Sequence, residues 1–278
     1  MNSELTIRGR SLGGIYTSVF VPEFGLMFDA GVALRENVGA RGICLSHGHA
    51  DHVGALPAFL GMRGLFGHHK PLSIYCPRAI EAELSEALKA FQILQTHDLN
   101  AVLVPMDAGD TVSIGPRLQL RAFKTYHPVP SLGYAVFESV KKLRPEFRGL
   151  PGEQIRALKQ TDQPIFDVIE RPYFAYATDT LPEVLKHEPW LLTVPELMIE
   201  CTFLDERKTL RDARRGGHVH LDELLPYLAT AQNRKIHLMH FSQLYQPDEI
   251  RARLLERLPE DVHSRVQPLL PKADVWWH

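Results

Sequence analysis

Short apolar runs separated by turn residues recur along the chain and predict a succession of β-strands. Residues 15–21 and 26–29 predict a hairpin, with the Pro-Glu-Phe-Gly segment at 22–25 as its turn. Further strands are predicted at 43–45, 72–76, 101–106, 118–125, 173–178, 197–201 and 236–241. The last two of these runs each carry one polar residue of interest, Glu200 and His240.

Helical spacing appears between several of these runs. Residues 53–60 are apolar and helix-compatible, and a second helix is predicted to start at Pro77. In that helix the positions that share one face, and that we expect in the core, are Ile80, Leu84, Leu88 and Phe91. Residues 153–158 predict one or two helical turns, a helix follows His220, and an amphipathic helix is predicted over 247–258.

Metal-binding residue types are concentrated directly after the apolar run at 43–45. The segment reads Ser46-His47-Gly48-His49-Ala50-Asp51-His52. Small residues at 48 and 50 let the backbone turn tightly, so His47 and His49 can approach one ion while Asp51 and His52 reach a second. Zinc accepts imidazole nitrogen and carboxylate oxygen. The segment therefore predicts a metal site on a strand-to-helix loop, against the alternative of a solvated histidine-rich loop.

Other candidate residues lie at or near the ends of predicted strands. His127 precedes a proline, which holds it extended and ends the strand there. Asp179 at a strand end has two oxygens that can bridge two cations. Glu200 lies in an apolar run and must therefore be paired or hydrogen-bonded. Asp29 is interpreted as a turn-capping carboxylate or one that supports a metal ligand.

Composition narrows the class of protein only moderately. The 278 residues are 45% hydrophobic and 23% charged, as expected of an ordinary soluble protein, and the net charge of −2 does not favour a nucleic-acid partner. Three cysteines beside apolar runs suit buried thiols in a reducing compartment. There is no signal-peptide pattern, membrane-spanning stretch, repeat or linker. We expect one cytoplasmic domain over residues 1–278.

Residues 141–171 are the one marked shift in composition. Basic and acidic side chains alternate there, and Gly149-Leu150-Pro151-Gly152 interrupts the segment. Two interpretations stay open, a solvated surface excursion and a short flap or reduced arm that contacts substrate. The basic residues of the segment are Lys141, Lys142, Arg144, Arg148, Arg156, Lys159 and Arg171.

The His-x-His-x-Asp-His segment resembles the signature of the metallo-β-lactamase superfamily. This resemblance implies an α/β fold, a four-layer αβ/βα sandwich, with a two-metal hydrolytic site. It implies that His47, His49 and His127 hold one zinc ion, that Asp51, His52 and His240 hold the second, and that Asp179 bridges them. Two such ions share a hydroxide and clamp the oxygens of an in-line displacement. The expected cofactors are two Zn²⁺ ions per chain, with Mn²⁺ or Fe²⁺ as alternatives.

A narrower resemblance extends from the first hairpin to about Tyr245. The segments that carry it are Phe123-Lys124-Thr125-Tyr126-His127, Ser131-Leu132-Gly133-Tyr134, Arg148-Gly149-Leu150-Pro151-Gly152, Glu200-Cys201-Thr202-Phe203-Leu204, Gly217-His218 and His240-Phe241-Ser242. They are similar to short-form ribonuclease Z, or tRNase Z, which removes 3′ trailers from precursor tRNA. The resemblance implies that Glu200 orients His218, which protonates the departing 3′ oxygen. Asp51 would act as base on the bridging water.

Two departures from the ribonuclease Z pattern leave the substrate open. Thr178-Asp179-Thr180 stands where many members have Gly-Asp-Thr, and Leu244 stands where they have an arginine suited to an RNA phosphate. The expected substrate is precursor tRNA, and the alternative is a small molecule such as a cyclic nucleotide, thioester or lactone. A non-catalytic protein that retains the fold is the rival from another class. The resemblance also suggests a homodimer, and His220 stays unassigned.

Overall fold

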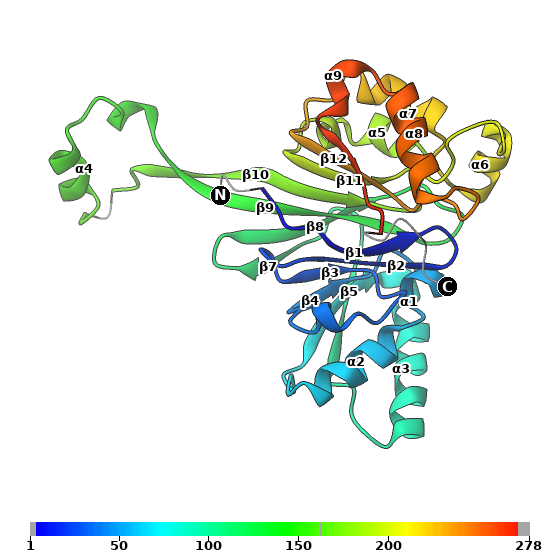
Figure 1. The fold of residues 1–278 in the computed structure, drawn as a ribbon. Helices are drawn as coiled ribbons and strands as arrows, with labels where there is room; N and C mark the ends of the chain where they lie inside the picture. The colour runs from blue at the N-terminus through cyan, green and yellow to red at the C-terminus, as the bar shows by residue number, and fades with distance from the viewer. Residues whose placement is uncertain (1–3, 162, 272–278) are drawn as a thin grey trace.

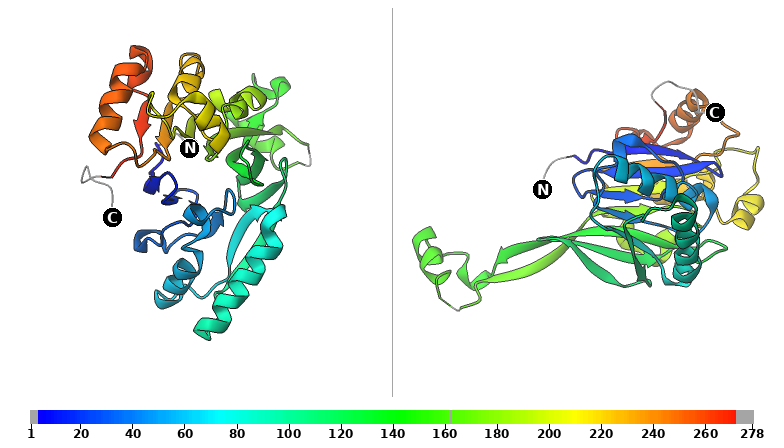
Figure 2. Two further views of the ribbon diagram at one scale, coloured as in Figure 1. Left: turned by 90° about the vertical axis from the view of Figure 1, so that its right-hand side faces the viewer. Right: turned by 90° about the horizontal axis from the view of Figure 1, so that it is seen from below.

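Two β-sheets face each other and carry helices on their outer surfaces in the computed structural model of the chain (Figures 1 and 2). The structure describes residues 4–161 and 163–271. Residues 1–3, which belong to the N-terminal segment searched for a signal-peptide pattern, lie outside this range. The four layers confirm the αβ/βα sandwich expected from the sequence.

The first sheet contains the strands of the N-terminal half. In spatial order they are β1 (Arg8–Leu12), β2 (Tyr16–Val21), β3 (Leu26–Phe28), β4 (Gly42–Cys44), β5 (Leu72–Pro77) and β6 (Ala101–Met106). The predicted hairpin is confirmed, because β2 and β3 pair antiparallel with Val21 opposite Leu26. From β3 to β6 the strands run parallel. Strand β1 was not predicted, because only its last residue is a large apolar one.

The second sheet is built from the rest of the chain. In spatial order its strands are β13 (Val266–Pro268), β12 (Lys235–Met239), β11 (Glu196–Glu200), β10 (Phe166–Ala177), β9 (Leu132–Leu143), β8 (Leu118–Lys124) and β7 (Thr111–Gly115). Strands β7 to β10 pair antiparallel and β10 to β13 pair parallel. Because β10, β11 and β12 run parallel, their carboxyl ends lie on the same edge of the sheet.

Helices cover the outer face of each sheet. Those of the first half are α1 (Ala50–Val53), α2 (Leu56–Leu65) and α3 (Glu81–Gln95), with short 3-10 turns η1 (Arg35–Asn37) and η2 (Arg78–Ile80). Those of the second half are α5 (Glu183–His187), α6 (Leu210–Gly216), α7 (Leu221–Leu228), α8 (Pro247–Arg257) and α9 (Glu260–His263), with η4 (Pro189–Leu192). Helix α4 (Gly152–Leu158) and η3 (Pro145–Phe147) instead lie between β9 and β10, away from the sheet faces (Figure 1). Within the described residues, no helix is long and apolar enough to cross a membrane.

Alternation along the strands divides the core into three layers. In β3, Leu26 and Phe28 point into the space between the sheets, while Met27 packs on the helix side. In β11, Met198 lies between the sheets and Ile199 packs under the outer helices. Both faces of these strands are therefore buried, which is why they read as continuous apolar runs. The three cysteines are buried as predicted, and burial raises the pKa of each thiol.

The predicted core face of the helix after Pro77 is wrong in part. Pro77 ends β5, and α3 begins only at Glu81, after a 3-10 turn. Leu88 is buried, but Phe91 is 46% exposed because the C-terminal half of α3 projects beyond the sheet (Figure 1). Helical spacing identifies a shared face correctly, yet it does not say how far the partner sheet extends.

Residues 141–171 form a protruding arm. Strands β9 and β10 leave the sheet together as a two-stranded ribbon, which carries η3 and α4 at its far end (Figures 1 and 2). The strand predicted at 173–178 is only the inner half of β10, since the outer half mixes apolar with charged residues and is exposed or half-buried. The predicted turns of helix at 153–158 are confirmed as α4.

Candidate metal centre

The candidate ligands come from loops that follow the strands of both sheets. The loop after β4 carries His47 and His49, and α1 carries Asp51 and His52 on its first turn. His127, Asp179 and His240 follow β8, β10 and β12. Sequence reasoning placed His240 inside its strand, but β12 ends at Met239. At His240 the backbone has already turned to a φ of 60°, and Asp179 has a φ of 46°. Non-glycine residues rarely adopt this conformation, and such strain tends to gather at functional sites.

The first group consists of His47, His49, His127 and Asp179, whose ligand atoms all lie within 4.8 Å of one another. His49 Nδ1 is 3.0 Å from His47 Nε2 and 3.3 Å from His127 Nε2. Asp179 Oδ2 is 3.6 Å from His47 Nε2 and 3.9 Å from His127 Nε2. Three ring nitrogens and one oxygen thus converge on a common point.

The second group consists of Asp51, His52 and His240, whose ligand atoms also lie within 4.8 Å of one another. Asp179 Oδ1 is 3.3 Å from His52 Nε2 and 3.2 Å from His240 Nε2. Its two oxygens therefore face the two groups, which is the arrangement a bridging ligand needs. Asp51 Oδ2 is 3.4 Å from His52 Nε2 and 3.7 Å from His240 Nε2.

Asp29 supports the second group from behind. Its carboxylate accepts hydrogen bonds from Ser46 N at 2.7 Å, from the Ser46 hydroxyl at 2.9 Å and from the Tyr176 hydroxyl at 2.7 Å. It also accepts one from His52 Nδ1 at 2.8 Å, because a carboxylate has no proton to give. When the ring is neutral, this bond places the lone pair of His52 on Nε2, which faces the site.

His127 is fixed in the same manner by the backbone. Its Nδ1 donates to the carbonyl of Gly217 at 3.1 Å, so Nε2 is left for the site. Gly217 has a φ of +76°, and a Cβ atom there would come within 2.8 Å of His127 Nδ1. Only glycine meets both requirements at this position.

The electrostatics of the cluster favour a neutral His47 and an ionised Asp179. At His52, in contrast, burial is outweighed by the carboxylates of Asp179 and Asp29, which raise the pKa of the ring. Burial and the neighbouring charge of His52 lower the pKa of His47 to about 2, so this ring is neutral. Burial alone would raise the pKa of Asp179, but His240 and then His52 hold it below the usual carboxyl range. Neutral imidazole and ionised carboxylate are the forms that bind cations.

Glu200 and His218 form a pair beside the second group. Glu200 is completely buried, and its Oε1 is 3.3 Å from His218 Nδ1. Burial lowers the pKa of His218, but the Glu200 carboxylate outweighs it and raises the pKa to about 9. The His218 ring stacks on that of His240 at 5.3 Å between centroids. A ring nitrogen of His218 also comes within 4.8 Å of the ligand atoms of Asp179 and His240.

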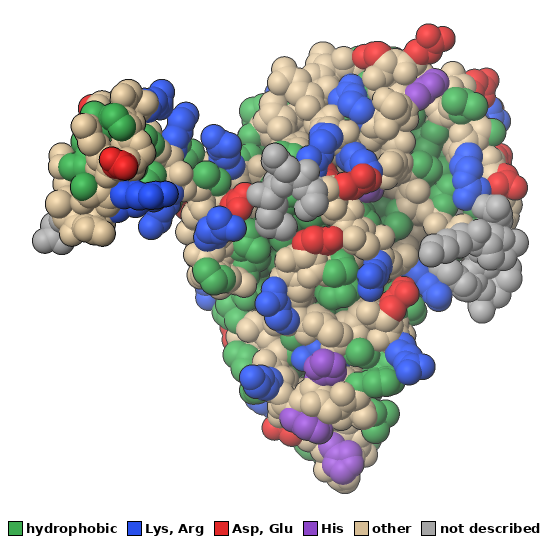
Figure 3. All heavy atoms as spheres, turned by 60° about the vertical axis from the view of Figure 1, so that its left-hand side comes forward, with side chains coloured by type: hydrophobic (Ala, Val, Ile, Leu, Met, Phe, Trp, Pro, Cys, Tyr) green, Lys and Arg blue, Asp and Glu red, His purple; other side chains and the backbone are tan. Residues whose placement is uncertain are grey.

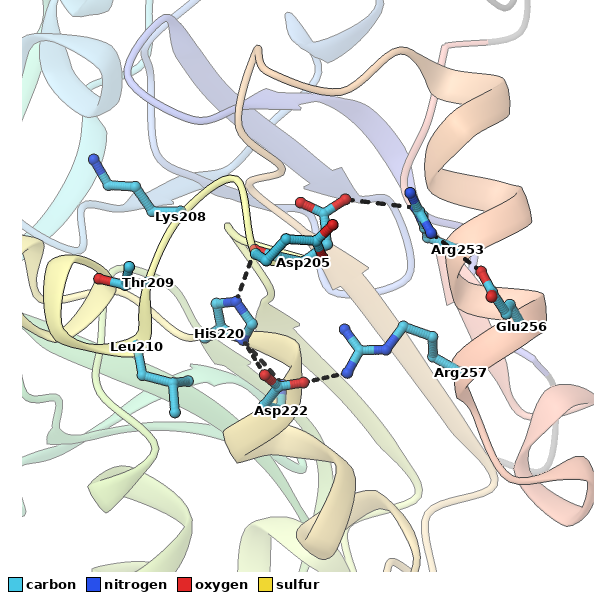
Figure 4. A pocket seen from close by; sticks show the side chains of 10 residues that line it. Asp205, Lys208, Thr209, Leu210, His220, Asp222, Arg253, Glu256 and Arg257 are labelled. Atoms are coloured by element: carbon cyan, nitrogen blue, oxygen red, sulfur yellow. Dashed lines mark hydrogen bonds and ion pairs between the residues drawn. The ribbon is translucent and has the colours of Figure 1, made fainter.

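His220 points away from the centre and caps a helix. Its Nε2 donates to the carbonyl of Asp205 at 3.1 Å, and its Nδ1 accepts from the backbone of Asp222 at the start of α7. Figure 4 shows this ring in the wall of a charged surface pocket, beside Asp222 and Arg257. The residue left unassigned by the sequence therefore has a structural role.

Three residues of the site gave no signal in the sequence. Tyr176 lies in an apolar strand, Ser46 looks like an ordinary loop serine, and Thr202 follows β11. Tyr176 and Ser46 bind Asp29, which contacts the candidate ligand His52. Thr202 contacts the candidate ligand His240 directly. A hydroxyl becomes informative only when its partners are known.

Comparison with known proteins places this site in a class. The profile of the Beta-lactamase superfamily domain matches residues 28–241, which include all seven candidate ligands. Among solved structures, Zn²⁺-bound PqqB from Methylobacterium extorquens matches the fold with a TM-score of 0.63 over 95% of this chain and 96% of that one, at 14% identity. The chain belongs to the metallo-β-lactamase superfamily.

Relatives in sequence define the family within that class. tRNase Z TRZ1 of Arabidopsis thaliana is 33% identical over 94% of this chain and 93% of its own length. The chloroplastic tRNase Z TRZ2 of the same plant is 32% identical over 95% and 74%. Human tRNase Z, short form, shares the fold with a TM-score of 0.59 over 87% of this chain and 93% of that one, at 17% identity. This chain is a ribonuclease Z-like, metal-dependent hydrolase.

Proposed function

We propose that the chain is an endoribonuclease that trims the 3′ end of precursor tRNA with two bound zinc ions. The observation that carries this proposal is the convergence of seven ligands on two points, beside the Glu200–His218 pair, in a relative of tRNase Z. We further propose that residues 1–278 form one metallo-hydrolase domain, with the arm as its extension.

The residues present fit two metal ions. Among the described residues, the buried Nε2 atoms of His52 and His240 have no hydrogen-bond partner, although carboxylate oxygens lie nearby. A cation between these nitrogens and oxygens satisfies both. We assign His47, His49 and His127 to one ion, Asp51, His52 and His240 to the other, and Asp179 to both. Zinc ions held by these residues would supply a lowered pKa of bound water and polarisation of the phosphoryl oxygens.

The side chains around the ions supply positioning and proton transfer. Asp51 is 13% exposed at the mouth of the site, where its carboxylate accepts the proton of the attacking water. His218, kept protonated by Glu200, donates a proton to the departing 3′ oxygen. The bond that breaks is therefore the one between phosphorus and the 3′ oxygen. Trimmed tRNA carries a 3′ hydroxyl, and the released trailer carries a 5′ phosphate.

The arm is the proposed contact for the body of the tRNA. Figure 3 shows Lys and Arg side chains on the arm, which projects from the rest of the molecule. Arg144 pairs with Asp167 at 2.9 Å, yet 34% of the arginine side chain stays exposed. A tRNA backbone that passes the arm would come within reach of these basic residues. Neutralisation of its phosphates contributes to binding affinity regardless of the RNA sequence.

We also propose a homodimer in the cytoplasm. Helix α3 leaves Phe91 46%, Ile93 77% and Leu94 78% exposed, an apolar strip that a second copy would cover. On the same helix Glu86 and Lys89 pair with each other at 2.8 Å, so they leave no unpaired charge beside this apolar strip. The mass in solution by light scattering tests this, with Leu94→Glu expected to give a monomer. The compartment stays a prediction, and one relative is named as chloroplastic.

A small-molecule substrate is the alternative that one observation favours. Leu244 is 49% exposed where the ribonuclease Z pattern has an arginine. Arg207 donates to the Leu244 carbonyl at 3.2 Å, but its guanidinium is held by Asp205 and Glu249. No replacement for the missing phosphate contact is seen at this point of the described chain.

The deciding experiment follows the ends of the products. Zinc-reconstituted protein is incubated with a precursor tRNA that has a 3′ trailer, and both product ends are mapped. A 3′ hydroxyl on the tRNA and a 5′ phosphate on the trailer are expected. A 2′,3′-cyclic phosphate would contradict the proposed attack, and an uncut precursor beside a hydrolysed cyclic nucleotide would favour the alternative.

A further inference from the structure

The hydroxyl of Thr202 lies between the acid pair and the second metal group. Thr202 is 4% exposed, and its Oγ1 lies 2.5 Å from Glu200 Oε2 and 3.0 Å from His240 Nδ1. A threonine hydroxyl has a single proton. Because the carboxylate has none to give, that proton goes to Glu200, and His240 Nδ1 must be the donor in the other bond.

This order of donors fixes the tautomer of His240. With Nδ1 protonated, the lone pair of the neutral ring is on Nε2, which faces Asp179 Oδ1 at 3.2 Å and Asp51 Oδ2 at 3.7 Å. Nε2 has no hydrogen-bond partner among the described residues. A lone pair that faces two carboxylates is favourable only with a cation between them. The hydroxyl of Thr202 therefore prepares His240 to bind a metal ion.

The same hydroxyl completes the surroundings of Glu200. The carboxylate accepts from Thr180 N at 2.6 Å, from Val219 N at 3.1 Å and from His218 Nδ1 at 3.3 Å, in addition to Thr202 Oγ1. Four donors surround a fully buried charge, so the carboxylate has a single orientation. Thr202 is two residues from Glu200 in the chain but 38 residues from His240. Its hydroxyl therefore connects the end of β11 to the loop that follows β12.

We propose that Thr202 is a positioning residue that orients His240 for the second metal ion and Glu200 for His218 at the same time. The acid pair and the second metal group are thereby built as one unit. This inference rests on the two-ion centre proposed above, and it does not depend on the identity of the substrate.

Two substitutions at Thr202 separate the hydroxyl from the shape of the side chain. Thr202→Val keeps the size and removes the hydroxyl, while Thr202→Ser keeps the hydroxyl. Thr180→Val is the matched control, because it removes another buried threonine hydroxyl next to Glu200. Thr180 Oγ1 contacts the backbone of Tyr126 and Leu181 and not His240.

The first readout is the affinity for zinc, measured by competition with a chelator. Loss of a group that supports a ligand typically weakens metal affinity about 10–100-fold. We expect this loss for the second ion in Thr202→Val, with the first ion unaffected, and recovery in Thr202→Ser. An unchanged second-ion affinity in Thr202→Val, or an equal loss in Thr180→Val, overturns the proposal.

The second readout is the ring of His240 in ¹⁵N NMR spectra of the same proteins. A slowly exchanging Nδ1 proton is expected in wild type and Thr202→Ser, and its loss in Thr202→Val. An equally protected proton in Thr202→Val overturns the proposal whatever the number of ions bound. Failure to cut RNA would instead overturn the substrate assignment, and it would leave both readouts unaffected.

Discussion

The metal centre and the arm are built on opposite principles. In the centre, buried polar groups each have several partners, and Asp29 alone accepts from Ser46, His52 and Tyr176. In the arm, two strands and a short helix stand clear of the core, and pairs such as Arg144–Asp167 are solvent-exposed. The centre is fixed by both sheets, whereas the arm contacts mainly itself.

This difference indicates that chemistry and substrate choice are separable. A change in the centre disturbs groups that depend on one another, so its effect is large and spreads to every substrate. A change in the arm alters the charge offered to a distant part of a large substrate and leaves the reacting groups in place. The predictions below test this separation, beginning with the largest expected effect.

Loss of the bridging carboxylate should have the largest effect. Asp179→Ala is expected to weaken both ions together, because each oxygen faces one group of ligands. Metal ions contribute several kcal/mol to catalysis, so activity should fall at least about 10³-fold on every substrate. His127→Ala is the comparison variant and should empty mainly one position. Metal analysis that finds both ions retained in Asp179→Ala would contradict the bridge.

Removal of the proposed acid should give a smaller and selective loss. His218→Ala is expected to lower turnover of RNA about 10²-fold with metal content intact. The loss should shrink for p-nitrophenyl esters, whose leaving group hardly needs a proton. Equal losses on good and poor leaving groups argue against proton donation, and a loss of metal would instead make His218 a ligand.

Charge reversal in the arm should affect RNA alone. Changing Lys141, Lys142, Arg144 and Arg148 to glutamate should abolish cleavage of precursor tRNA, because repulsion replaces attraction. The slope of log affinity against log salt should fall by up to about 3–4, at roughly 0.9 per phosphate contact. Hydrolysis of bis-p-nitrophenyl phosphate and metal content should persist. If both substrates fail together, the two regions are not separable.

Stability offers the smallest test of the comparison. Arg144→Ala removes an exposed ion pair and should change the free energy of unfolding by less than about 1 kcal/mol. Asp29→Asn replaces a buried carboxylate that accepts several hydrogen bonds, and a loss of about 1–3 kcal/mol is expected. Denaturant unfolding of the two variants measures the contrast. A larger loss for Arg144→Ala would show that the arm is tied to the core.

The sequence predicted the centre better than the arm for a physical reason. Strands buried on both faces are continuous apolar runs, and candidate ligands such as His47, Asp179 and His240 lie just beyond their ends. The outer halves of β9 and β10 mix apolar with charged residues and are exposed or half-buried. Nothing in the local pattern separates such a ribbon from a loop.

Positions that depend on distant partners could not be predicted at all. Tyr176 and Thr202 contact Asp29 and His240 from other strands or loops. His220 is only two residues after His218, but its ring turns to Asp205 and Asp222 and not to the centre. Phe91 fits a helical core face, yet the sheet does not reach it. Local periodicity predicts whether a segment is a helix or a strand, whereas the role of a residue depends on its neighbours in the fold.

The central claim is that a two-ion centre performs the cleavage while the arm selects precursor tRNA. The most direct measurement compares zinc-loaded wild type on a precursor tRNA with a 3′ trailer and on bis-p-nitrophenyl phosphate, at low and high salt. The account predicts trimming of the tRNA at low salt, its steep loss as salt rises, and hydrolysis of the small diester that changes little. Hydrolysis of the small diester with no binding or trimming of the precursor at low salt would contradict it.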